Sequence, residues 1–210
     1  MSSQHKNLSD FSNSEVPSGA AFRFGIVVAE WNAEITNALY QGAYQTLLKY
    51  GTLAENIFTY PVAGSFELIS GADLLLQKGG LDAVICLGCV IQGETRHFDF
   101  ICNAVANGVS NVSIKYSKPV IFGVLTTNDH QQAFDRAGGK HGNKGDEAAV
   151  TAIKMADLAV TLKALFTLKL KSYRMKKLLY IAVIALTLGT LASCSSKLCP
   201  AYNTYPRGTR

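Results

Sequence analysis

The stretch GCVIQGETRHFDF, residues 88–100, combines residue types that could bind an anion and move a proton. Gly88 and Gly93 carry no Cβ, so the backbone beside them can approach a ligand closely. A helix is predicted to begin near Thr95, and the free N–H groups and dipole of a helix N-terminus favour an anion. His97 lies in the first turn of that helix, and an imidazole can exchange a proton near neutral pH. The stretch therefore predicts a phosphate site with a proton donor beside it.

Other residues could contribute to such a site, but each has a plainer interpretation when taken alone. Arg136 could supply the guanidinium fork that binds phosphate, or be a solvated charge. Glu67 could be an ordinary acid at a helix start, and Trp31 and Phe122 could be core aromatics. The glycine-rich run 138–145 lacks the Gly-Lys-Ser/Thr ending of a phosphate-binding loop. Spacing alone predicts only a site for a phosphate-containing small molecule.

The elements that must position these residues alternate along the chain. Apolar runs predict strands at 23–31, 56–64, 81–91 and 119–127, and helical spacing predicts helices at 35–51, 66–80, 97–116, 129–138 and 146–166. Strands that are apolar on both faces and alternate with helices indicate a parallel sheet covered on both sides. With right-handed crossovers, this predicts an α/β three-layer sandwich around a four-stranded parallel sheet. Ligands bind outside the carboxyl ends of such strands, where the polar residues gather.

The charge of the chain is unevenly distributed. The whole chain has a net charge of +5, but residues 1–162 hold eleven basic and fifteen acidic residues, a net charge of −4. Residues 163–210 hold nine basic residues and no acidic one. The basic charge is therefore absent from the predicted domain, which argues against a nucleic-acid-binding protein.

Cys86 and Cys89, in the sequence CLGC, invite a redox or metal interpretation. Both fall inside an apolar strand, where residues three apart point to opposite faces, whereas a redox pair normally opens a helix. The pattern therefore favours two buried core residues.

The two ends of the chain differ from the domain between them. Residues 1–20 are rich in Ser and Asn and predict a flexible arm, 21–166 form the domain, and 167–210 form a basic and hydrophobic tail. From Met175 the tail resembles a bacterial lipoprotein signal peptide, with residues 191–194 (LASC) as the lipobox. Since such signals belong at an N-terminus, this suggests two adjacent reading frames joined together, and a genuine tail anchor is the alternative.

Four motifs in order resemble the lumazine synthase family of riboflavin biosynthesis: PVAGSFEL, GCVIQGETRHFDFICN, PVIFGVLTT and DRAGGKHGNKGDEAA, within a match from Phe24 to Leu162. The resemblance implies a flavodoxin-like sheet and a transferase that needs no metal or organic cofactor. It implies condensation of 5-amino-6-(D-ribitylamino)uracil with 3,4-dihydroxy-2-butanone 4-phosphate to 6,7-dimethyl-8-ribityllumazine, with release of phosphate and water.

The resemblance also assigns roles to residues, with His97 as the catalytic proton donor. The aminouracil would be bound by Trp31, Ser65, Phe66, Glu67, Cys89, Val90 and Ile91, with Phe122 supplied by a neighbouring subunit. The butanone phosphate would be bound by Glu94, Thr95 and Arg136, and Asn32 and Lys140 are additional candidates.

The resemblance further implies a cytoplasmic bacterial homo-oligomer, a pentamer or an icosahedral capsid of sixty subunits, with active sites shared between subunits and riboflavin synthase as a partner. Membrane contact would come only through the C-terminal segment. Two alternatives are a non-catalytic flavin- or pterin-binding module and a structural shell protein. A third is a lipid-anchored envelope protein, which rests on the C-terminal segment alone.

Overall fold

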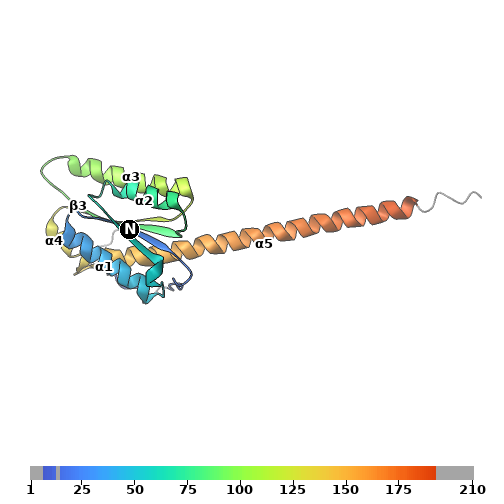
Figure 1. Ribbon diagram of the computed structural model, residues 1–210, viewed down its shortest axis with the longest axis horizontal. Helices are drawn as coiled ribbons and strands as arrows, with labels where there is room; N and C mark the ends of the chain where they lie inside the picture. Colours follow the sequence, from blue (N-terminus) through green and yellow to red (C-terminus); the bar gives the residue numbers. More distant parts are fainter. Residues whose placement is uncertain (1–6, 13–14, 193–210) are drawn as a thin grey trace, which may run out of the picture. The chain divides into compact units, whose positions relative to one another are not determined.

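The computed structural model describes residues 7–12 and 15–192, and it confirms the predicted four-stranded parallel sheet (Figure 1). The strands are β1 (Phe24–Ala29), β2 (Ile57–Val62), β3 (Ala83–Ile91) and β4 (Val120–Thr127), in the order β2-β1-β3-β4. All three ladders are parallel, so the carboxyl ends of the strands meet at one edge of the sheet.

Helices cover both faces of this sheet and make the three predicted layers (Figure 1). Helix α1 (Ala33–Lys49) and the first turns of α5 (Lys144–Ala192) pack on one face, and α2 (Leu68–Lys78) and α3 (His97–Tyr116) on the other. Three short elements complete the domain: the 3₁₀ turn η1 (Ala54–Asn56), α4 (His130–Phe134) and a hairpin of β5 (Ala137–Gly139) and β6 (Gly142–Asn143).

Strand β3 is the centre of the core because its side chains are buried on both faces. Ile85, Leu87 and Cys89 pack toward α1 and α5, whereas Val84 and Cys86 pack toward α2 and α3. Cys86 and Cys89 are therefore free thiols on opposite faces of the sheet, as the strand period predicts.

Residues 7–12 and 15–20, which belong to the segment predicted as a flexible arm, contact the domain. The N–H of Leu8 donates to the carbonyl of His141 (2.7 Å), and Ser9 Oγ accepts from the N–H of Asn143 (2.9 Å). Val16 packs against the core, and the N–H of Gly19 donates to the carbonyl of Tyr50 (2.7 Å). The described part of the segment is therefore held by hydrogen bonds and apolar contact that its polar composition does not reveal.

Helix α5 continues to Ala192, well beyond the end predicted near Phe166. The chain separates into two compact units, 1–161 and 162–210, and α5 contains residues of both. In the second unit the described apolar side chains, such as Leu165, Phe166 and Leu178, are largely exposed. Among the helices of residues 7–12 and 15–192, none has an apolar stretch that could span a lipid bilayer. Ser193 and Cys194 of the predicted lipobox lie outside the described residues.

Candidate active site

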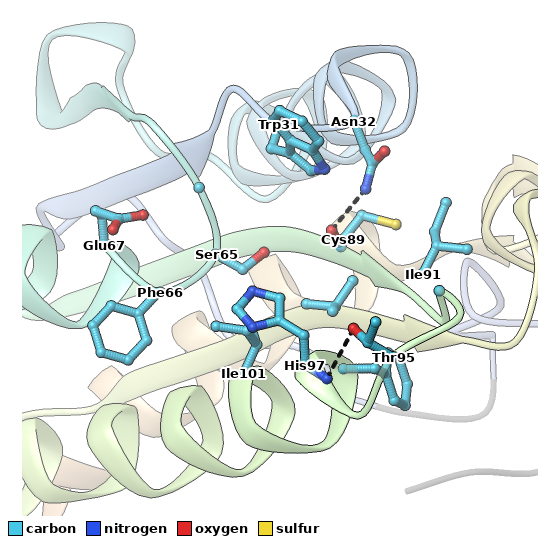
Figure 2. Close-up of a pocket in the computed structure, with 14 residues that line it drawn as sticks. Trp31, Asn32, Ser65, Phe66, Glu67, Cys89, Ile91, Thr95, His97 and Ile101 are labelled. Atoms are coloured by element: carbon cyan, nitrogen blue, oxygen red, sulfur yellow. Dashed lines mark hydrogen bonds between the residues drawn. The ribbon is translucent and has the colours of Figure 1, made fainter.

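A cavity of about 670 Å³ opens at the carboxyl ends of β1, β2 and β3 (Figure 2). Its lining comes from the loops after these strands and from the first turns of α3. The lining residues are Trp31, Asn32, Gly64, Ser65, Phe66, Glu67, Cys89, Val90, Ile91, Gly93, Thr95, His97, Phe98 and Ile101. This is the edge of the sheet at which ligands of open parallel sheets bind.

The β1–α1 loop places an exposed indole at the mouth of the cavity. The N–H groups of Glu30 and Trp31 donate to the carbonyls of Val62 (2.8 Å) and Ala63 (3.1 Å), which ties the loop to the end of β2. Trp31 is 72% exposed, so its indole can present a flat apolar face on which a heteroaromatic ring could stack. In Figure 2 it lies across the cavity from His97.

The segment after β2 brings a buried hydroxyl and a carboxylate to the cavity. Ser65 is buried, and among the described residues its Oγ has no hydrogen-bond partner. Leaving a buried hydroxyl unpaired costs free energy, so a ligand or water that paired with it would be favoured. Glu67 is exposed at the start of α2, and its carboxylate can only accept hydrogen bonds when ionised. Together they suit a ligand rich in hydroxyl groups.

The start of α3 supplies an imidazole to the cavity. His97 is the first residue of the helix, its side chain is exposed, and its N–H lies 3.4 Å from Thr95 Oγ1. The phosphate site was predicted with a helix that begins near Thr95. Helix α3 begins at His97, two residues later, so Thr95 lies in the preceding loop. The hydroxyl of Thr95 and the N–H groups of the first helical turn can still converge on an anion.

The thiol of Cys89 lies at the end of β3 but is not suited to nucleophilic chemistry. Burial raises the pKa of Cys89 to about 11, so very little thiolate exists at neutral pH. A backbone role remains, since the carbonyl of Cys89 accepts a hydrogen bond from Asn32 Nδ2 (2.9 Å).

Four predicted residues do not line the cavity of the described chain: Glu94, Phe122, Arg136 and Lys140. Phe122 lies on the edge strand β4, and Arg136 follows α4, where its Nη1 donates to the carbonyl of Gln132 (3.0 Å). Glu94 and Lys140 are exposed on loops. One subunit therefore brings together ten of the predicted residues and leaves these four elsewhere.

Four lining residues were not among the assigned site residues: Gly64, Gly93, Phe98 and Ile101. Gly93 was named only as a glycine beside which the backbone can approach a ligand, and Gly64 only within its motif. Ile101 could have been found from helical spacing, because it lies one turn after His97 on the same face of α3. Phe98 directly follows His97, and this spacing does not reveal it.

Comparisons with known proteins show that the chain is similar to members of one family. The family model for 6,7-dimethyl-8-ribityllumazine synthase matches residues 21–159. A protein of that name from Cytophaga hutchinsonii is 65% identical over 155 residues, which cover 74% of this chain and 97% of the relative. Those from Flavobacterium johnsoniae and Parabacteroides distasonis are 53% and 51% identical, covering 74% and 76% of this chain and 82% and 99% of the relatives.

Proposed function

This chain belongs to the 6,7-dimethyl-8-ribityllumazine synthase family, and we propose that the cavity at the carboxyl ends of β1, β2 and β3 is its active site. The chain is a transferase of riboflavin biosynthesis. It condenses 5-amino-6-(D-ribitylamino)uracil with 3,4-dihydroxy-2-butanone 4-phosphate to 6,7-dimethyl-8-ribityllumazine, phosphate and water. The observation that supports the site is that ten predicted residues from four separate segments line a single cavity.

The aminouracil is proposed to lie between the Trp31 loop and the end of β3. Its pyrimidine ring stacks on the exposed indole, and the backbone of Cys89, Val90 and Ile91 bonds the edge of the ring. The ribityl hydroxyls reach Glu67 and the unpaired Ser65 Oγ. Phe66 and Asn32 complete the lining on this side.

The butanone phosphate is proposed to bind at the start of α3. The N–H groups of the loop and first helical turn, with the Thr95 hydroxyl, donate hydrogen bonds to the phosphate. Glu94 is compatible with this only if its N–H faces the phosphate and its carboxylate points away, which its exposed position permits. Arg136 and Lys140 come from outside the cavity of the described chain, so they require a second subunit or a movement of their loop.

The reaction then follows from two substrates held side by side. The arylamine attacks the butanone carbonyl, and loss of water gives an imine. A proton shift, for which His97 is the suitably placed acid–base group, allows phosphate to leave. The resulting enol rotates and tautomerises to a ketone, the ribitylamino nitrogen attacks this new carbonyl, and loss of a second water closes the ring. Positioning of the two substrates provides much of the acceleration.

The finished site is proposed to be shared between subunits of a pentamer, which is compatible with a sixty-subunit shell and with riboflavin synthase as a partner. Phe122 supports sharing: it belongs to the matched motif PVIFGVLTT, is partly exposed on an edge strand, and lies outside its own chain's cavity. A neighbouring subunit would bring it against the pyrimidine.

Mixing two defective variants tests this sharing. His97→Ala and Phe122→Ala chains are each unfolded, mixed and refolded together. If each site takes His97 from one chain and Phe122 from its neighbour, some sites in mixed oligomers carry both native residues, and activity exceeds the average of the two pure variants. Activity equal to that average would contradict sharing.

The enzyme is proposed to work in the cytoplasm. Its butanone substrate is a phosphate ester, which is ionised at neutral pH and does not cross membranes unaided. The free thiols of Cys86, Cys89 and Cys102 are compatible with a reducing compartment. The exposed apolar and basic residues after Leu162 provide the one described surface suited to membrane association, if such association occurs.

Lumazine formation, followed by absorbance, tests the activity on the full chain with both substrates present. Turnover that requires each substrate is the expected result. A chain that is folded and binds the aminouracil but forms no lumazine would favour the alternative of a non-catalytic binding module. Assembly into shells without turnover would favour the structural alternative.

A further inference from the structure

Asn32 adopts a backbone conformation that is costly for most residues. Its φ and ψ angles are 58° and 48°, in the left-handed region, and among the described residues only Ser117 is another non-glycine residue with positive φ. Asn tolerates this region better than most residues, but glycine does so at lower cost. We therefore expect the side chain of Asn32 to make an interaction that glycine could not make.

The side chain does not perform the task usual for its position. Asn32 is the N-cap of α1, where an Asn side chain normally accepts a hydrogen bond from the first helical turn, yet it makes no such bond. Instead its Nδ2 donates to the carbonyl of Cys89, 57 residues away (2.9 Å; Figure 2).

The acceptor lies where the sheet leaves β3 without a neighbour. The β1–β3 ladder ends at the pair Val28–Leu87, whereas β3 continues beside β4 as far as Ile91. The Cys89 carbonyl lies beyond the last β1 pair, and the Asn32 amide serves as its donor in place of a strand. The bond thus ties the Trp31 loop to the end of β3, as backbone bonds tie the same loop to β2.

We propose that Asn32 is a positioning residue that fixes the Trp31 indole and the β3 end relative to each other. This proposal rests on the proposed function, in which these two parts hold the face and the edge of one pyrimidine ring. Because Trp31 is 72% exposed, packing does not hold its indole, and the anchored loop on either side of it sets its place. Losing the bond would therefore weaken aminouracil binding without touching the phosphate subsite.

Two variants of the full chain remove the bond in different ways. Asn32→Gly accepts the same backbone angles and deletes the amide, whereas Asn32→Asp keeps the shape but replaces the donor with an oxygen facing the Cys89 carbonyl. Ser117→Gly is the matched control, because it places glycine at the other positive-φ position, which is exposed at the end of α3 and outside the cavity.

Trp31 is the only tryptophan in the chain, so its fluorescence reports on this loop alone. The three variants and the unchanged chain are titrated with the aminouracil in the absence of the butanone, and the KM for each substrate is measured. For both Asn32 variants we expect the aminouracil dissociation constant and KM to rise about fivefold to tenfold, the effect of losing one hydrogen bond. The KM for the butanone phosphate stays within about twofold, and Ser117→Gly matches the unchanged chain.

Two results would overturn the proposal, and they are distinguishable from failure of the site assignment. Asn32→Asp or Asn32→Gly binding the aminouracil as tightly as the unchanged chain would show that the bond is not needed. An equal rise of both KM values would indicate a merely structural role. If the aminouracil does not change Trp31 fluorescence even in the unchanged chain, the stacking assignment fails, and this proposal fails with it.

Discussion

At the scale of the residue, His97 is the side chain for which we propose a single proton transfer. It is the one histidine among the lining residues, it is exposed at the start of α3, and its proposed task is one proton shift before phosphate leaves. We expect His97→Ala to lower kcat by at most about a hundredfold, because positioning of the two substrates survives the change. Steady-state lumazine formation measures this.

His130→Ala is the control for this variant. His130 lies outside the cavity and its Nε2 is 3.4 Å from the Glu34 carboxylate on the surface, so the control should retain full kcat. A complete loss of activity in His97→Ala, with the fold intact, would mean that the histidine does more than move one proton. No loss at all would remove it from the mechanism.

Arg136 is an assigned phosphate-binding residue that does not line the cavity of the described chain. Its guanidinium bonds the Gln132 carbonyl in the same chain, but four of its N–H donors could still reach a phosphate. Arg136→Ala should raise the KM for the butanone phosphate about tenfold or more, the effect of losing charged hydrogen bonds. The KM for the aminouracil is the internal control, and an unchanged KM for the phosphate substrate would refute the assignment.

The two thiols of β3 make stability depend on pH at the alkaline end. Burial raises the pKa of Cys86 from 9.0 to about 12 and that of Cys89 to about 11. Above pH 9 the unfolded chain loses these protons before the folded chain does, so stability falls as pH rises from 9 toward 11. Melting temperatures over this range should fall less steeply for Cys86→Ala than for the unchanged chain, and equal slopes would contradict the argument.

At the scale of the element, Gly88 of β3 packs closely against Ser65 and against Leu68 of α2. A Cβ on Gly88 would lie 2.7 Å from Ser65 Oγ and 2.9 Å from Leu68 Cδ1. Gly88→Ala should therefore destabilise the fold by about 1–3 kcal/mol, as overpacking of a core does. It should also displace Ser65, whose hydroxyl is proposed to bind the ribityl chain. Thermal unfolding and the KM for the aminouracil measure the two effects.

Gly93→Ala is the matched control for stability, since a Cβ there meets no atom within 4 Å and the residue has no positive φ. Its melting temperature should stay within about a degree of the unchanged chain. If Gly88→Ala is equally stable, then Ser65 and Leu68 move aside easily, and the close packing under the cavity is less constraining than the distances indicate.

The bounds of most strands and helices could be predicted from the sequence. The four strands and helices α1 to α3 fall within a few residues of their predicted bounds, because apolar period and glycine stops mark them, and α3 has the predicted range 97–116. The helix predicted at 129–138 is wrong in its last residues, because α4 ends at Phe134 and β5 begins at Ala137. Strands β5 and β6 are too short to carry a period and were not predicted. The end of α5 was predicted too early, near Phe166. No proline or glycine between Gly145 and Gly189 marks a stop, so the helix can continue to Ala192.

At the scale of the whole molecule, the part of the site that one chain forms could be predicted from the motifs together with the sheet topology. The lining residues between Trp31 and His97 come from three strand ends that a parallel sheet must bring together, so topology alone gathers them. The Asn32 bond depends on a carbonyl 57 residues away, and no pattern in the sequence reveals it. Phe122 and Arg136 lie outside the cavity of the described chain, and nothing in their motifs predicts this.

The segment after Leu162 is not expected to affect catalysis. None of the lining residues belongs to it, and the family match ends at residue 159. Its basic and apolar side chains, among them Lys169, Leu178 and Tyr180, are exposed in the described helix.

A chain that ends at Leu168 should therefore have the same kcat as the full chain, and both of its KM values should agree with those of the full chain within about twofold. The full chain should associate more readily than the shortened chain, through its apolar surface. Activity assays and light scattering on the two chains measure this. Activity in the shortened chain alone would mean that the segment blocks assembly of complete sites, and activity in the full chain alone would mean that it contributes to them.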